Sequence, residues 1–200
     1  MRVVWVRLAA ALAVVLSVGG AAGAEIDGPI SFVPWKVLAP GEAPPDAPLI
    51  LYWIPASPSD FKHSDLLISR PLTLYASQCV AMKVVRPDDS ERIASLGGPP
   101  LPAAILVEGD GRRLGSVAAE RGVLRVRAVE RLVRDKLAER DMSVESQLDE
   151  ARKKASSGDR QGAIAAYRAI WSQRCLFPRH GREAQRALKR LGVEVAESGS

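Results

Sequence analysis

Short apolar runs alternate with helical patterns through the middle of the chain, and they predict a sheet. Residues 49–53 and 103–107 are continuously apolar, which is typical of strands covered on both faces. Residues 79–85 form another apolar run. Residues 112–117 follow Asp110-Gly111, and an Asp-Gly turn between apolar segments indicates a hairpin. Four strands are therefore expected, the last two of them adjacent.

Helical patterns separate these strands. A first helix is expected over residues 59–69, with Pro71 as a break or kink behind it, because proline removes a helix hydrogen bond. A short helix is expected through Leu96. The last helix of this region is expected over residues 119–139, where four apolar residues recur at helical spacing: Val126, Val129, Val133 and Leu137.

The order of these elements is strand, helix, strand, helix, two strands, helix. A helix between the first two strands implies that they pair in parallel. Residues 25–47 form a proline- and glycine-rich N-terminal segment, and an apolar island at residues 30–38 predicts one edge strand, because Pro34 cannot donate within a sheet. The fold class is therefore α/β, a central mixed sheet flanked by helices.

Two motifs at the ends of these strands carry a resemblance to a known family. The first strand ends in Tyr52-Trp53 and leads into Ser57-Pro58-Ser59-Asp60, and Leu101-Pro102 precedes the hairpin. This layout, over residues 48–140, resembles the thioredoxin family. In that family an aromatic-Trp pair leads to Cys-x-x-Cys at a helix start, and a cis-proline precedes the hairpin.

The resemblance implies a thioredoxin-like sandwich that lacks the family's redox thiols. Ser57 and Asp60 stand at the two cysteine positions, where a helix N-terminus would favour a thiolate. A serine nucleophile needs an adjacent base, and a Ser57–His63–Asp60 hydrolase has no nucleophile elbow in this sequence, so we expect Ser57 and Asp60 to be helix caps. Pro102 is expected to be the cis-proline, which shapes the turn or, with Leu101, still binds extended peptide.

The chain beyond residue 140 starts a new helical pattern. Ser143 is a good N-cap, so a boundary is expected at residues 141–143. Gly158-Asp159, followed by Ala163 and Tyr167, resembles the turn and second helix of a tetratricopeptide repeat. This resemblance implies a small all-α extension over residues 143–192.

The extension is expected to contain a third helix over residues 183–191, after a break at Phe177-Pro178. An independent solenoid needs about three repeats, so these helices must pack on the main domain or on a partner. Residues 193–200 are expected to be a flexible tail.

Residues 1–24 have the pattern of a secretory signal peptide, with a positive start, an apolar run and small residues up to Ala24. The run is shorter than the roughly 20 residues that span a bilayer. We expect export to the periplasm or the medium after cleavage near Ala24, with no stable membrane anchor. The net charge of +5 indicates neither nucleic-acid nor membrane binding, so no nucleic acid is expected as a partner.

The chain contains two cysteines, Cys79 and Cys175. In an oxidising compartment they are expected either to form a disulfide between domain and extension or to be two buried thiols. A third interpretation makes Cys79 the reactive thiol of an atypical oxidoreductase or peroxide-handling enzyme, with Cys175 as its resolving partner. That enzyme would need an exposed Cys79, and the strand setting argues against it.

Other side chains could contact a partner. Arg127, Arg131 and Arg134 share one face of the last helix of the domain and could bind an anionic partner. Tyr167 and Trp171 could form a recognition surface on the extension, although core packing explains them as well. Neither histidine of the chain has a second ligand at metal spacing, so we expect no metal site and no cofactor.

These patterns together predict an exported, non-redox thioredoxin-like protein that binds or scaffolds another protein or peptide. The alternative is an enzyme that uses Cys79. A third hypothesis is oligomerisation through the repeat-like extension, so the oligomeric state stays open at this point.

Overall fold

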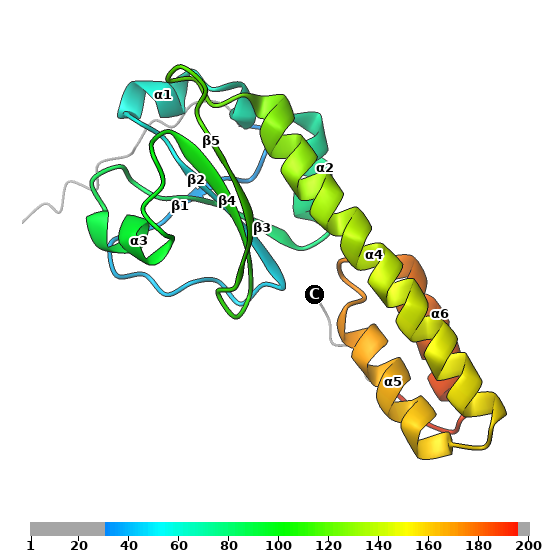
Figure 1. Ribbon diagram of the computed structural model, residues 1–200. Coiled ribbons are helices and arrows are strands. Elements are labelled where there is room, and N and C mark those ends of the chain that lie inside the picture. The colour runs from blue at the N-terminus through cyan, green and yellow to red at the C-terminus, as the bar shows by residue number, and fades with distance from the viewer. Residues whose placement is uncertain (1–30, 196–200) are drawn as a thin grey trace, which may run out of the picture.

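The computed structural model describes residues 31–195, which form one mixed sheet and a helical extension (Figure 1). The strands are β1 Lys36–Val37, β2 Leu49–Ile54, β3 Val80–Val84, β4 Ala103–Glu108 and β5 Arg113–Ala118. The helices are α1 Pro58–Lys62, α2 Arg70–Ser77, α3 Ser90–Ser95, α4 Val126–Ser156, α5 Arg160–Ser172 and α6 Pro178–Arg190, with a 3₁₀ turn at Asp65–Leu67. The expected signal peptide and the end of the expected tail lie outside the described residues.

The five strands lie in the order β1-β3-β2-β4-β5. β1 and β2 both run parallel to β3, whereas β4 runs antiparallel to β2, and β5 antiparallel to β4. The connection from β2 to β3 contains helices, as a parallel pair requires. This is the thioredoxin-like sandwich predicted from the sequence, and the fold class is confirmed. β1 is the short edge strand expected within residues 30–38.

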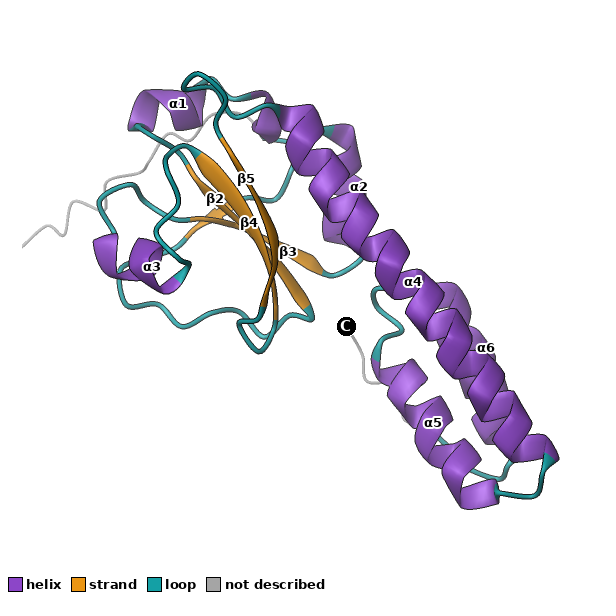
Figure 2. Cartoon of the chain, in the orientation of Figure 1, coloured by secondary structure: helices purple, strands orange, loops and turns teal. Residues whose placement is uncertain are grey.

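Helices cover both faces of the sheet (Figure 2). All of β2 is buried, and its alternate residues belong to two apolar clusters because successive side chains point to opposite faces. Leu51 packs in a cluster with Leu72 of α2 and Val133 of α4. Tyr52 packs in the other cluster, with Ile93 of α3. This two-sided burial explains why the strand is a continuous apolar run.

α4 is a single helix of 31 residues, so the boundary expected at residues 141–143 is wrong. Ser143 is an exposed residue inside the helix and does not cap a new one. The helix continues because its buried stripe continues, with Val144, Leu148 and Ala151 following Leu137. Its first half covers the sheet, and its second half projects beyond the sheet and carries α5 and α6 (Figure 1).

Three other helix boundaries differ from the expectation. The first helix is shorter, because α1 ends at Lys62 and the chain then forms the 3₁₀ turn capped by Ser64. Pro71 lies in the first turn of α2 and does not break a helix, since that position needs no amide hydrogen. α4 begins at Val126, after a turn with an isolated bridge between Glu120 and Val123.

The helical extension consists of the second half of α4 with α5 and α6. Gly158, with φ +85°, turns the chain out of α4, and the Asp159 side chain caps α5 by accepting from the Gly162 amide. α6 starts at Pro178, five residues earlier than expected, because proline again occupies a first turn. No helix within residues 31–195 is both long and apolar enough to cross a bilayer.

The continuity of α4 gives a direct mutational test. Ser143→Pro removes a hydrogen bond inside the helix, so we expect the free energy of unfolding to fall by about 3 kcal/mol. Ser143→Ala, the matched control, keeps that bond and should cost nothing. Urea unfolding followed by circular dichroism measures both. If a new helix began at residue 143, proline would be tolerated in its first turn and the two variants would be equally stable.

Candidate functional site

The end of β2 places Ser57 and Asp60 at the start of α1. Ser57 Oγ accepts a hydrogen bond from the Asp60 amide at 3.1 Å, and Asp60 Oδ2 accepts one from the Ala56 amide at 2.9 Å. The Ser57 side chain therefore caps the first turn of the helix, and the Asp60 carboxylate holds the backbone of the residue before the cap. This arrangement occupies the serine and carboxylate oxygens with backbone donors and brings no base to the serine.

A group of aromatic side chains lies beneath α1. The Trp53 ring centroid is 5.4 Å from that of Trp35 and 5.3 Å from that of Phe61 on α1. Trp35 Nε1 donates to the Leu66 carbonyl at 2.9 Å. Trp53 Nε1 is buried without a hydrogen-bond partner among the described residues. These contacts fix α1 on the end of the sheet.

The loop before β4 lies at the same end of the sheet as Ser57. Ile54, the last residue of β2, pairs with Ala103, the first residue of β4. The bond between Leu101 and Pro102 is cis, and the Pro102 carbonyl accepts from the Ala119 amide at 2.9 Å. Leu101 is half-buried, and its own backbone N–H and C=O have no hydrogen-bond partner within residues 31–195. The loop therefore presents one free donor and one free acceptor beside α1.

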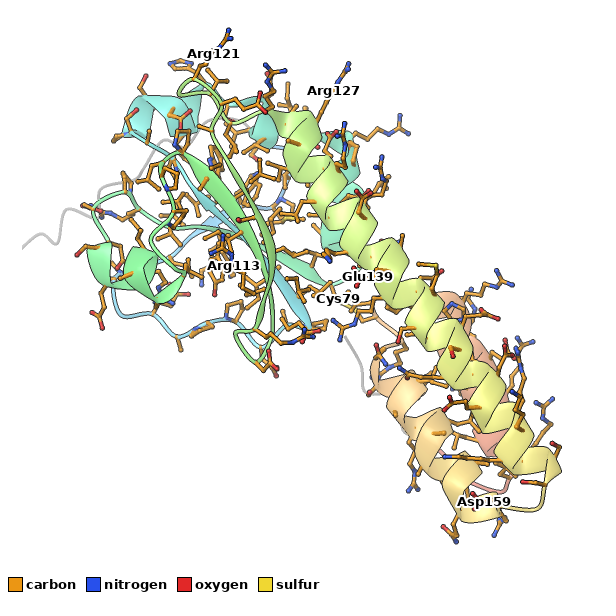
Figure 3. The ribbon with its side chains drawn as sticks, viewed as in Figure 1. Cys79, Arg113, Arg121, Arg127, Glu139 and Asp159 are labelled. Atoms are coloured by element: carbon orange, nitrogen blue, oxygen red, sulfur yellow. A yellow bond between two sulfur atoms is a disulfide. The ribbon has the colours of Figure 1, made fainter. Side chains whose placement is uncertain are left out.

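The cysteines lie at the opposite end of the sheet. Cys79 precedes Val80, which pairs with Leu49 at the start of β2, so the length of β2, about 20 Å, separates Cys79 from the Ser57 end. In this structure Cys79 and Cys175 form a disulfide, with their Cα atoms 5.8 Å apart. The bridge joins the α2–β3 connection to the α5–α6 connection, next to the middle of α4 (Figure 3). Neither thiol is free in the chain.

Two side chains expected as a recognition surface on the extension have different environments. Tyr167 is only 4% exposed, so of the two uses expected from the sequence it serves core packing and contributes no recognition surface. It shares the inner face of α5 with Ala163 and Ile170, which explains its burial. Trp171 is half-buried, and the Arg174 guanidinium lies 4.6 Å from its ring centroid.

The arginine face expected on α4 carries both signs of charge. Arg127 and Arg131 are exposed and make no ion pair within the described residues. Arg134 pairs with Asp135 at 2.8 Å, and Glu130 lies between Arg127 and Arg131 in sequence. Figure 3 shows Arg127 at the end of α4 nearest α1. The face is only partly cationic.

The two histidines occupy different settings. His63 follows α1 and is exposed, and no hydrogen bond in the described chain links it to Ser57 or Asp60, so nothing supports the hydrolase. His180 is buried, with Nε2 2.9 Å from Asp141 Oδ1 and Nδ1 3.5 Å from Glu145 Oε2. This contact ties α6 to α4, and no local pattern along the chain predicts it. The described residues contain no cluster of three or more groups that could hold a metal.

A groove of about 410 Å³ lies between the β4–β5 hairpin, α4 and the end of α5. Five of its six charged side chains pair with one another, and the sixth, that of Arg113, donates to Ser116 Oγ. Arg140 Nη1 is 2.6 Å from Glu108 Oε1, and Arg112 Nη2 is 2.5 Å from Glu108 Oε2. Lys136 pairs with Glu139 at 2.7 Å. The groove is a network of ion pairs between the sheet and the extension rather than an open site.

Three of the shifted pKa values belong to residues on or beside β1, β3 and β2, and others lie on α2, on α4 and in the turn after β3. Burial and the neighbouring Lys36 ammonium lower the pKa of Lys83, and the two lysines are paired across β1 and β3. The hydrogen bond from Lys36 lowers the pKa of Glu42. Burial raises the pKa of Tyr52 in β2. These shifts follow from burial and ion pairs of the fold and mark no acid or base beside α1.

No known protein family and no curated protein matches this sequence. Among solved structures, a thioredoxin from Trypanosoma brucei brucei is similar, with 22% sequence identity. The similarity covers 46% of this chain and 77% of that thioredoxin, with a TM-score of 0.32. The thioredoxin-like assignment of the present chain therefore rests on its own strand order and registers.

Removing the disulfide should destabilise the protein strongly. The bridge closes a loop with a sequence separation of 96, for which the chain-entropy model gives about 4.5 kcal/mol. Cys79→Ser, Cys175→Ser and the double variant should lose the same free energy of unfolding, because each removes the same link. Urea unfolding without reductant measures the loss. A double variant as stable as the wild type would contradict a stabilising bridge.

Proposed function

We propose that the protein is an exported, non-redox thioredoxin-like module that binds another protein or peptide. The observation that carries this proposal is the position of the two cysteines and their pairing in a disulfide. The chain has only two, and both are joined in a bridge at the end of the sheet remote from Ser57. The positions of the family's redox pair are then Ser57 and Asp60, whose side chains accept from backbone amides at the start of α1.

The peptide-binding surface in this proposal is the loop at Leu101. An extended peptide binds a protein edge through main-chain hydrogen bonds, for which it needs unpaired backbone groups. The N–H and C=O of Leu101 have no partner in the described chain, and the half-buried side chain supplies apolar contact. The neighbouring α1 is fixed by the packing of Phe61 on Trp53.

The extension supplies the scaffolding part of the proposal. Its turn at Gly158-Asp159 and the buried Ala163 and Tyr167 have the spacing of a tetratricopeptide-like hairpin. α5 and α6 pack on α4, so the extension enlarges the surface that a partner protein can contact. Export is included because the pattern of residues 1–24 is that of a signal peptide.

Loss of the redox pair is tested by restoring it. We expect the wild type to give no dithiothreitol-dependent reduction of insulin disulfides. The double variant Ser57→Cys with Asp60→Cys should gain this activity, because the first cysteine would lie at a helix N-terminus that stabilises a thiolate. The Cys79→Ser variant is the control for any activity that comes from the native cysteines. Activity in the wild type that Cys79→Ser abolishes would favour the enzyme and overturn the proposal.

Peptide binding at the Leu101 loop is tested with peptides selected by display on the wild type. Leu101→Pro removes the free amide hydrogen, and the loss of one buried hydrogen bond should lower affinity by about tenfold. Leu101→Ala keeps the amide and is the matched control, expected to change affinity far less. Titration calorimetry measures both. Equal affinities for the wild type and the Leu101→Pro variant would place peptide binding elsewhere.

A further inference from the structure

α6 carries five cationic side chains on one face. They are Arg179, Arg182, Arg186, Lys189 and Arg190, and all five are exposed. At about 100° per residue they fall within roughly 100° of arc around the helix. The opposite face is buried against α4 and α5 and includes His180, Ala184 and Leu188. We call the five exposed residues the α6 cationic face.

The α6 cationic face is not neutralised by the rest of the described chain. None of its five side chains makes an ion pair or a hydrogen bond within residues 31–195. The single carboxylate of α6, Glu183, is bound to Arg152 of α4. α6 therefore has five cations and one carboxylate, a balance of +4, whereas α4 has eight cations and seven carboxylates, a balance of +1. The modest net charge of the chain conceals this local concentration.

The surroundings of the α6 cationic face indicate what it contacts. The large hydrophobic residues exposed in the described chain all lie outside α5 and α6. A stable protein interface needs an apolar core, which this face does not offer. The aromatic residues of the extension are buried or, for Trp171, half-buried beneath Arg174, so none is open for stacking on nucleic-acid bases.

An anionic lipid surface fits these properties. It presents phosphates over a plane, and guanidinium groups bind phosphate in bidentate fashion. Such a surface needs only clustered cations, without apolar insertion. α6, a straight element of 13 residues, about 20 Å long, presents its charges along one line. We infer that the α6 cationic face binds the protein peripherally to a phospholipid bilayer with anionic headgroups.

Vesicle co-sedimentation tests this inference, using the chain without residues 1–24, which carry cations and an apolar run of their own. That form retains every described residue. We expect binding to phosphatidylcholine vesicles that contain about one third phosphatidylglycerol, and none to pure phosphatidylcholine. Binding should weaken strongly as salt is raised to about 150 mM, where charges are screened beyond about 8 Å.

The deciding variant is Arg182→Glu with Arg186→Glu. Each cation near an anionic lipid surface is worth about fivefold in affinity, so reversing two should lower it by at least about 25-fold. Lys62→Glu with Arg70→Glu is the matched control. It makes the same change in net charge at exposed, unpaired cations of α1 and α2, and should leave binding nearly unchanged. Circular dichroism checks folding, and Arg182→Gln with Arg186→Gln replaces the first variant if it is unfolded.

Three results would overturn the inference. The first is no sedimentation of the wild type with the anionic vesicles at low salt. The second is an equal loss of vesicle binding in both charge-reversed variants, which would mean that binding depends on net charge and not on the α6 cationic face. The third result is stronger competition by another polyanion. Duplex DNA or polyglutamate would displace the protein from the vesicles at a lower concentration of negative charge than added anionic vesicles need. The partner would then be a different polyanion.

Discussion

Six buried residues of α4 form one apolar stripe, and both halves of the protein are built on it. Val129, Val133 and Leu137 cover the sheet, and the remaining members, Val144, Leu148 and Ala151, pack in the extension. A helix keeps its orientation from turn to turn, so the stripe leads from one core into the next without a linker. The buried residues of the sheet face and of the extension accordingly belong to a single apolar cluster.

Two further links join the extension to the sheet. Arg140 of α4 pairs with Glu108 of β4 and donates to Gln173 Oε1 at 3.4 Å. Pairs of this kind at a partly exposed surface contribute about 0–1 kcal/mol. The bridge from Cys79 to Cys175 contributes more, because it restricts the unfolded chain over a long loop. The covalent link and the helix therefore position the extension, and the ion pairs adjust the contact.

The sequence predicted the sheet well because burial on both faces leaves a pattern that can be read locally. β2 and β4 are continuous apolar runs, and the caps at Ser57 and Asp159 are short-range interactions. The errors occur where a local signal has two meanings. Ser143 is a good N-cap residue in front of a helical pattern, yet the tertiary burial of Val144 keeps the helix intact.

A proline has the same ambiguity, because it can mark either a break in a helix or the first turn of one. Pro71 and Pro178 predict helix breaks from the sequence, but each lies in the first turn of a helix, where its missing amide hydrogen costs nothing. Long-range contacts could not be predicted at all. The pairing of His180 with Asp141 depends on how α6 lies on α4, which no spacing along the chain specifies. The α6 cationic face has no local signal either, because the exposure of its residues follows from that same packing.

Because α4 is uninterrupted, its length fixes both the distance between the sheet and the extension and their relative rotation about the helix axis. Each residue added to α4 near Ser143 would rotate everything beyond it by about 100° and advance it by about 1.5 Å. Seven added residues restore the angle to within about 20° but move the extension outward by about 10 Å. Cys175 would then lie out of reach of Cys79, whose Cα atom is 5.8 Å away. Surface loops tolerate changes of length. In α4 near Ser143, in contrast, any insertion or deletion changes the distance and the rotation between the sheet and the extension at the same time.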